Sequence, residues 1–183
     1  SRGTTPDNEI NGWKHDYQFR KGKWTLNDYN FKEPNKNQIV ESLTQSKFTN
    51  NKNYGHYDYS PIHDLPRARQ LVKLRMEAEE LPGNTVAGQS TCIDFFAGGL
   101  FKVDKHELKE ERGEYLLVAV THTATDSSYF AGEGGGSGYA NRFTCIPANV
   151  PYRPAAEHKK PIMRGPQTAI VTGPAGEEIY IDE

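Results

Sequence analysis

One long strand pattern constrains the fold of this chain more than any other feature. Residues 114–125 (EYLLVAVTHTAT) are rich in β-branched and apolar residues, and both alternating rows are apolar over the first half. A second strand pattern follows at residues 139–146, beyond a glycine-rich loop at residues 126–138. The two segments predict an antiparallel pair with a long exposed loop. The buried row is either Tyr115, Leu117 and Ala119 or Leu116, Val118 and Val120, and the strand can be covered on both faces.

Further strands are predicted before and after this pair. Aromatic and imidazole side chains alternate with polar ones from Trp13 to Phe19, and the alternation resumes at Trp24 after a turn signal, so residues 11–33 predict a β-hairpin. Residues 34–53 are rich in Asn, Lys and Gln and predict a long, partly mobile connection. Two short strands are expected between residues 85 and 103, with a glycine turn or bulge between them.

The chain contains one strong helix pattern. Apolar residues recur at helical spacing between Leu65 and Leu81, Asp64 can cap the first turn, and Pro82 follows the last turn. Pro66 lies in the first turn, where its missing N–H costs little. The predicted fold class is therefore mainly β with one major helix, an α+β arrangement.

The C-terminal part of the chain differs in composition. Four prolines between residues 147 and 161 predict an extended linker. Beyond the linker, residues 168–172 and 178–182 flank a Gly-Pro-Ala-Gly turn and predict a final hairpin. Because two strands are only marginally stable alone, this hairpin is expected to belong to a larger unit.

Composition indicates a folded chain with a thin core. Leu, Ile, Val and Phe make up only about 19% of the 183 residues, yet the net charge is −2 and aromatic residues reach 11%. Such a chain is expected to complete its burial against partner subunits. The near-neutral charge argues against nucleic acid as the main ligand. The longest uncharged, mostly apolar run, residues 115–121, is far too short to span a membrane.

Several residue groups are candidates for chemical sites. The glycine run at residues 132–138 lacks the Lys-Ser/Thr pair of a phosphate-binding loop, which favours a plain hairpin loop. Four metal-ligand side chains lie close together in the sequence, but their spacing fits no compact ligand pattern and one is the predicted helix cap; they are His56, Asp58, His63 and Asp64. Glutamates between residues 107 and 114 alternate with basic residues, which favours a solvated turn.

The two cysteines are predicted to be structural. Cys92 could act as a nucleophile with His122, but both fall in strand patterns, where a small buried thiol and a strand histidine are the simpler interpretation. Cys92 and Cys145 are both expected to be reduced thiols, although a single bridge between them stays open. A cysteine or metal hydrolase is therefore only a distant alternative, and no catalytic residue, cofactor or metal is predicted.

The exposed aromatic residues suit an interface or a sugar site. Trp and Tyr anchor protein interfaces and also stack on sugar rings. The thin core favours an interface, with a carbohydrate-binding β-module as the alternative. The interface candidates are Trp13, Tyr17, Phe19, Trp24, Tyr29 and Phe31.

Three segments at the C-terminal end resemble one known family. The strings NRFTCIP (residues 141–147), YRP (152–154) and GPQTAIVTGPAGEEI (165–179) are similar to the VgrG spike proteins of bacterial type VI secretion. The aromatic residues at 13–31, and the Tyr-Asp-Tyr segment, helix and cysteine between residues 57 and 92, look like the hub segment of the same family. Residues 54–65 and 126–138 depart most from the family pattern.

The resemblance implies a non-enzymatic part of a machine similar to a contractile phage tail. Its implied domains are an aromatic hairpin and mobile connection of the hub (residues 1–53), a β-barrel-like hub domain with one helix (54–147), a proline-rich linker (148–164) and the opening of an OB-fold neck (165–183). The implied assembly is a homotrimer that docks on Hcp tube hexamers, with a PAAR tip protein and effectors reached through other regions. The implied location is cytoplasmic during assembly, followed by secretion or delivery into a target cell.

Overall fold

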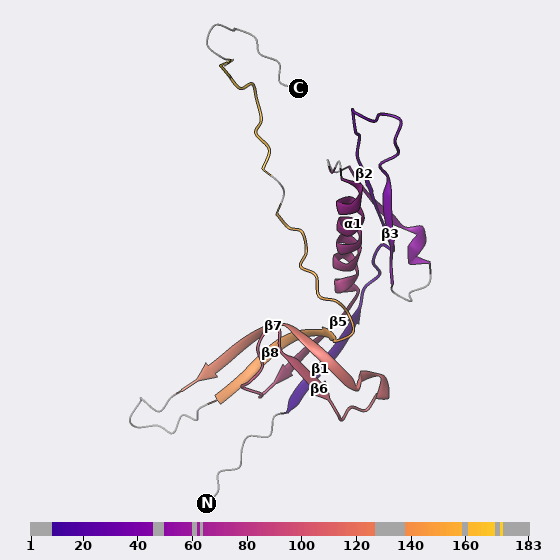
Figure 1. Cartoon of the computed structure of the whole chain (residues 1–183). Helices are drawn as coiled ribbons and strands as arrows, with labels where there is room; N and C mark the ends of the chain where they lie inside the picture. Colours follow the sequence, from indigo (N-terminus) through magenta and orange to yellow (C-terminus); the bar gives the residue numbers. More distant parts are fainter. Residues whose placement is uncertain are drawn as a thin grey trace, which may run out of the picture.

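The structure is a computed structural model that describes residues 9–45, 50–59, 62, 64–126, 138–158, 161–170 and 173. The strands form two separate β-sheets, the larger below the smaller in the view of Figure 1, and one helix lies beside the smaller sheet. The larger sheet has the strand order β1-β5-β8-β7-β6, and the smaller has the order β3-β2-β4. The strands are β1 (Ile10–Tyr17), β2 (Lys23–Asn27), β3 (Val40–Leu43), β4 (Gly55–Tyr59), β5 (Asn84–Ser90), β6 (Leu100–Val103), β7 (Gly113–Thr125) and β8 (Gly138–Pro147).

The five-stranded sheet is antiparallel throughout and curls around an aromatic and aliphatic core. The predicted pair of long strands is confirmed as β7 and β8. We call the side of the sheet that carries the core the inner face. Its buried residues are Val86, Val103, Tyr115, Leu117, Phe143 and Cys145. The predicted class, mainly β with one helix, is therefore confirmed.

A bulge in β7 decides which of its side chains are buried. The pairing register shifts between Leu117 and Ala119, so Val118 is the extra residue. Tyr115 and Leu117 are buried before the bulge, whereas Ala119 is exposed and Val120 packs against the core after it. Neither predicted row is buried along the whole strand, because the bulge moves the inward position by one residue.

The predicted aromatic hairpin at residues 11–33 is wrong. Both strands exist, but β1 pairs with β5 in the larger sheet, whereas β2 pairs with β3 and β4 in the smaller sheet. Gly22 does not form a hairpin turn: its N–H bonds to the carbonyls of Asn51 and Tyr54, and a Cβ there would lie 2.5 Å from the Asn51 carbonyl carbon. The glycine thus permits a close approach of two backbones rather than a reversal of the chain.

The prediction of a long connection at residues 34–53 is also wrong in part. This segment contains strand β3 and a 3-10 turn, Asn51–Asn53, and it buries the side chains of Gln38 and Asn51. The preference of Asn, Lys and Gln for loops was outweighed by the tertiary partners that the segment finds in β2.

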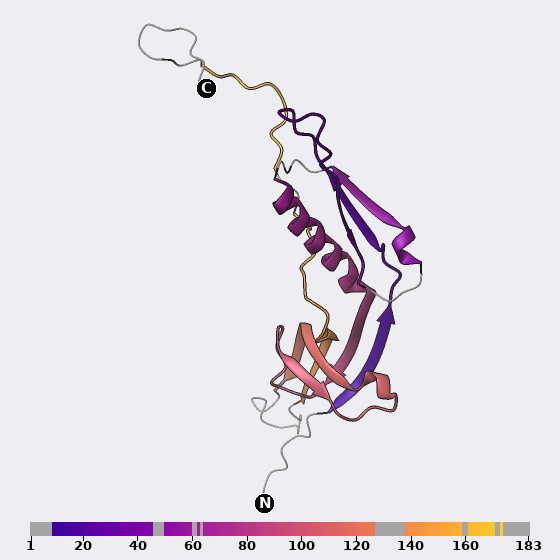
Figure 2. The ribbon, with the colours of Figure 1, turned by 45° about the vertical axis from the view of Figure 1, so that its right-hand side comes forward.

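The predicted helix is confirmed as α1 (Leu65–Glu80). It lies along one face of the three-stranded sheet (Figure 2), where Ala68 and Val72 pack with Leu26 and Val40. Pro66 lies in the first turn as expected, but the Asp64 side chain makes no capping hydrogen bond. The apolar contact with the sheet, rather than the cap, therefore holds the helix in place.

The chain after β8 leaves the larger sheet as an extended segment. The described residues between 151 and 170 contain no helix or strand, and an ion pair of 2.7 Å between Arg153 Nε and Glu77 Oε2 fastens the segment to α1. The predicted C-terminal hairpin lies mostly outside the described residues, and residues 168–170 carry no strand.

Candidate assembly surface

The two tryptophans pack within the chain. The Trp13 ring meets Tyr115 edge to face at 4.9 Å on the inner face, and its Nε1 donates to Glu111 Oε2 at 2.8 Å. Trp24 packs against the core between α1 and the smaller sheet, with its ring 4.0 Å from the ring of His56. Because the two rings lie in different sheets, they do not form the single stacking platform that a sugar-binding hairpin needs.

The other four predicted aromatic residues are exposed. Tyr17, Phe19, Tyr29 and Phe31 expose between 55% and 72% of their surface. Tyr17 stacks on His15 at 4.2 Å, and Phe19 meets Tyr54 edge to face at 5.4 Å. Tyr17 and Phe19 therefore lie where β1 leaves the larger sheet, while Tyr29 and Phe31 follow the end of β2.

The three-stranded sheet presents a second set of exposed apolar side chains. Leu43, Tyr57 and Tyr59 are aligned with Lys23, Thr25 and Asn27, one position away from the residues that face α1. They expose 50%, 59% and 58% of their surface. We call this group, on the side of the sheet opposite α1, the open face. The alternation in the sequence GHYDY was the signal that could have revealed it.

Glu111 is the centre of a buried polar network, so the prediction of a solvated turn is wrong for this residue. It is 7% exposed, at the end of the 3-10 turn Lys109–Glu111. His15 Nδ1 lies 2.7 Å from its Oε1, and the Tyr115 hydroxyl donates to its backbone oxygen at 3.1 Å. The turn is thereby tied to β1, which explains why this carboxylate is buried although its neighbours are exposed.

The network also sets the charge state of the carboxylate. Burial raises the pKa of Glu111, but hydrogen bonds from Trp13, His15 and Tyr115, together with the charge of His15, outweigh burial and lower the pKa below its ordinary value of 4.5. Burial, then the Glu111 charge, raises the pKa of Tyr115 to about 12. The site thus combines an ionised carboxylate with a neutral phenol, which suits a fixed structural contact.

The cysteine and histidine candidates do not form a nucleophilic pair in the described contacts. Both cysteines are free and buried, and burial raises the pKa of the Cys145 thiol to about 12. His122 Nδ1 lies 2.6 Å from the Tyr139 hydroxyl, which also donates to the backbone oxygen of Cys92 at 3.3 Å. The contact runs through the carbonyl of Cys92, so it supports packing of β8 rather than thiol chemistry.

The remaining candidate sites fall partly outside the described residues. This applies to His63 of the predicted metal cluster and to residues 132–137 of the glycine run. Among the residues that the structure describes, no three His, Cys, Asp or Glu side chains are placed to hold a metal ion. In that same part of the chain, no helix is both long and apolar enough to cross a membrane.

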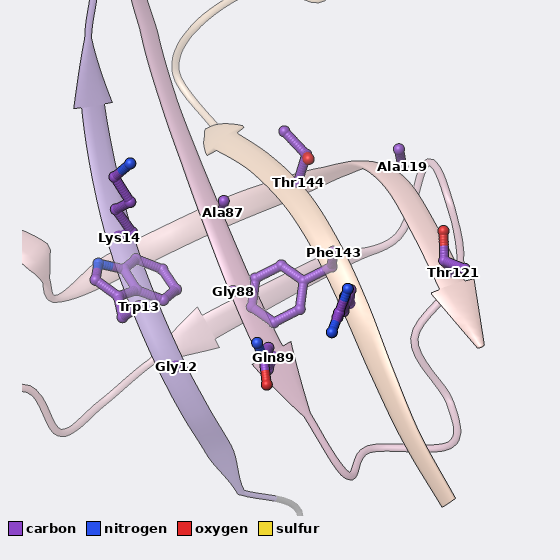
Figure 3. A pocket seen from close by; sticks show the side chains of 11 residues that line it. Gly12, Trp13, Lys14, Ala87, Gly88, Gln89, Ala119, Thr121, Phe143 and Thr144 are labelled. Carbon is purple, nitrogen blue, oxygen red and sulfur yellow. The ribbon is translucent and has the colours of Figure 1, made fainter. Parts of the chain in front are cut away.

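A shallow depression of about 600 Å³ crosses β1, β5, β8 and β7 (Figure 3). Small side chains line much of it, and Lys14 and Arg142 are among the exposed lining residues. The Phe143 ring lies over Gly88, where an added Cβ would come within 2.2 Å of the ring. The glycine therefore leaves room for the Phe143 ring, whose far edge occupies the space that a side chain would take.

The chain is similar to known proteins in sequence and in fold. A profile of the family described as phage tail baseplate hub (GPD) matches residues 1–128. The chain is 31% identical over 179 residues to the type VI secretion system spike protein VgrG1b of Pseudomonas aeruginosa, covering 93% of this chain and 23% of the relative. It is 29% identical over 180 residues to the actin cross-linking toxin VgrG1 of Vibrio cholerae, covering 95% of this chain and 16% of the relative. The chain thus spans a quarter or less of the length of these relatives.

The fold is similar to that of solved phage tail proteins. A 43 kDa tail protein of prophage MuSo2 from Shewanella oneidensis aligns with a TM-score of 0.54 at 10% identity, covering 78% of this chain and 42% of that protein. A tail protein from Neisseria meningitidis aligns with a TM-score of 0.50 at 12% identity, covering 82% and 43%. At such low identity, these two likenesses concern the fold alone.

Proposed function

Because this chain belongs to the phage tail baseplate hub (GPD) family, we propose that it is a structural part of a type VI secretion spike. In this proposal it forms part of a trimeric hub that docks on the secretion tube and carries the needle and effectors toward a target cell. The observation that carries the proposal is the match to VgrG spike proteins over 93% of the chain. Mechanical support, rather than catalysis, is then the task of the fold.

The exposed aromatic residues support an assembly role. The larger sheet covers its aromatic core with its own strands, whereas Tyr57 and Tyr59 on the open face and Phe31 beyond β2 stay more than half exposed. Large aromatic side chains at a protein surface are typical anchors of interfaces. We assign the exposed residues to contacts with neighbouring copies, which three-fold symmetry would repeat around a closed ring.

The proposal extends to parts of the assembly beyond this chain. Residues 1–147 would belong to the hub, because β1 and β2 pair with β5 and β4 of the segment 54–147; residues 148–164 would form the linker and residues 165–183 the start of an OB-fold neck. Hcp hexamers would contact the hub, while a PAAR tip protein and effectors would attach through other regions. Assembly would take place in the cytoplasm before delivery.

We also propose that this region has no enzymatic activity of its own. The toxin-named relative from Vibrio cholerae matches over only 16% of its own length, which leaves room for a toxic activity elsewhere in that protein. Within the described residues of this chain, the buried Cys145 thiol and the paired Glu111 carboxylate are both held in packing contacts.

Association in solution tests the proposal. Light scattering should show the mass rising with concentration toward three copies, and a Tyr57→Ser/Tyr59→Ser variant should associate more weakly. Thr123→Ser, an exposed change on β7, serves as the matched control and should behave as wild type. A chain that stays monomeric up to about millimolar concentration, both alone and within a protein of the full length of its VgrG relatives, would contradict the hub proposal.

A further inference from the structure

The larger sheet has two open edges that face a common groove. β1 and β6 stand at the two ends of the strand order, so within the described residues each pairs with a neighbouring strand on one side only. We propose that the groove between them receives a β-strand from a partner polypeptide, which would close the curled sheet into a barrel. This site goes beyond the proposed hub contacts, since it lies on the larger sheet and does not require the trimer.

The backbone of β6 has hydrogen-bonding groups directed at the groove. The Leu117 N–H donates to the Gly99 carbonyl at 2.9 Å. Because backbone groups alternate in direction along an antiparallel strand, Phe101 and Val103 then bond toward β7. The N–H and C=O groups of Leu100 and Lys102 consequently point to the open edge.

The same reasoning applies to β1. The Gln18 N–H donates to the Gly83 carbonyl at 3.1 Å, in register with the pairing of β1 and β5. Alternation then directs the backbone groups of Trp13 and His15 away from β5, toward the open edge. Two strands thus present unpaired donors and acceptors to the same side, as a strand-receiving site requires.

A groove of about 450 Å³ lies between these edges. It is lined on one side by residues 10–13 of β1 and on the other by residues 102–107. The Trp13 ring spans toward the opposite side, 6.5 Å from the Phe101 ring and 5.9 Å from the His106 ring. Beyond Trp13, the contact between His15 and Glu111 closes the groove with side chains rather than with strand hydrogen bonds.

The lining specifies the chemistry of the occupant. Trp13 and Val103 belong to the apolar inner side, whereas the exposed Lys102, Lys105 and Glu107 form a rim of mixed charge. A strand that alternates apolar and uncharged polar residues would match both sides. Because β6 has four residues, the occupant needs a paired segment of about four or five residues.

A short peptide can serve as the probe. The peptide acetyl-Thr-Val-Thr-Val-Thr-Val-Thr-amide has the required alternation, and acetyl-Thr-Thr-Val-Val-Val-Thr-Thr-amide has the same composition in a permuted order. The two should be titrated into the isotopically labelled protein while the backbone amides of Trp13 and Lys102 are followed by NMR. Saturable shifts of these amides are expected with the alternating peptide only.

Two variants of Lys102 separate the contribution of its backbone N–H to peptide binding from that of its side chain. Both Lys102→Pro and Lys102→Ala lose the ion pair with Asp104, but only proline removes the N–H directed at the groove. Since that N–H does not bond to β7, Lys102→Pro should fold, which its NMR spectrum will show. Relative to Lys102→Ala, it should weaken peptide binding roughly tenfold, as expected for one lost hydrogen bond.

Three results would overturn the strand site. They are the absence of saturable shifts up to about 2 mM peptide, equal binding of the permuted peptide, and equal binding by the two Lys102 variants. The hub proposal is judged separately by the mass in solution, so the failure of one does not imply failure of the other.

Discussion

The five-stranded sheet and the three-stranded sheet bury their side chains in different ways. The larger sheet curls around six buried core residues, and aromatic rings from β1, β6, β7 and β8 meet inside it. The smaller sheet has only Leu26, Val40, Ala68 and Val72 in its buried cluster, because α1 covers one face and leaves the open face exposed. The contrast teaches that the larger sheet encloses its own core, whereas the smaller sheet leaves one face exposed, and we propose this open face as the contact with a partner.

The largest effect is expected inside the larger sheet. Leu117→Asp would place an unpaired charge at a position that is 2% exposed, and it should lower the free energy of unfolding by about 3–5 kcal/mol. Ala119→Asp, beyond the bulge on the same strand, should change it by less than about 0.5 kcal/mol. Urea denaturation measures both. Similar losses in the two variants would refute the change of face at the bulge.

A smaller loss is expected in the core of the smaller sheet. Leu26→Ala removes a side chain that is 2% exposed and packed against α1, so unfolding should become easier by about 3 kcal/mol. Hydrogen exchange of the backbone amides will show which region is destabilised. Protection should fall mainly in α1 and β2, and an equal fall across both sheets would contradict a separate core in the smaller sheet.

The polar network around Glu111 should contribute less to the free energy of unfolding than the two apolar cores. Glu111→Ala leaves the indole N–H of Trp13 without its acceptor and should cost about 2 kcal/mol at neutral pH. Because the pKa of Glu111 is lower in the folded protein than its ordinary 4.5, its stabilising effect is present at neutral pH and is lost as the pH falls through the folded pKa. The difference between wild type and variant should therefore shrink as the pH falls below 4.5 and through the folded pKa, and a constant difference across that range would contradict the network.

The smallest effect on stability is expected at the open face. Tyr57→Ser and Tyr59→Ser should each change the unfolding free energy of the dilute protein by less than about 0.5 kcal/mol, because both side chains are more than half exposed. Thermal unfolding at low concentration measures this change. A loss comparable to that of Leu26→Ala would mean that the open face is packed in the monomer.

Local sequence patterns predicted helices and strands better than they predicted which strands pair. The helix follows from apolar residues at helical spacing, and the β7–β8 pair follows from two strand patterns that one loop joins; both are confirmed. The hairpin failed because Trp13 and Trp24 show the same alternation, and alternation does not say which strand will be the neighbour. The burial of Glu111 could not be predicted either, because its hydrogen-bond partners Trp13 and His15 lie 98 and 96 residues away in the sequence.

The amino-acid composition predicted that an interface exists, but not which aromatic residues form it. A low content of Leu, Ile, Val and Phe together with 11% aromatic residues indicated an interface, but the pattern could not separate Trp13, which packs against the core, from Phe31, which is 72% exposed. Burial depends on long-range pairing, and the alternating strands of both sheets carry aromatic residues. The open face was missed because residues 54–65 depart from the family pattern and were not assigned a strand.

The central claim is that the open face of the smaller sheet becomes covered when copies associate, while the exposed side of β7 beyond its bulge stays uncovered. Hydroxyl-radical footprinting of dilute and concentrated protein tests this most directly. Labelling of Tyr57 and Tyr59 should fall as the mass in solution rises, while the exposed residues of β7 beyond its bulge, such as Thr123, keep their labelling. If association proceeds while Tyr57 and Tyr59 remain fully labelled, the open face is not the contact and the account is contradicted.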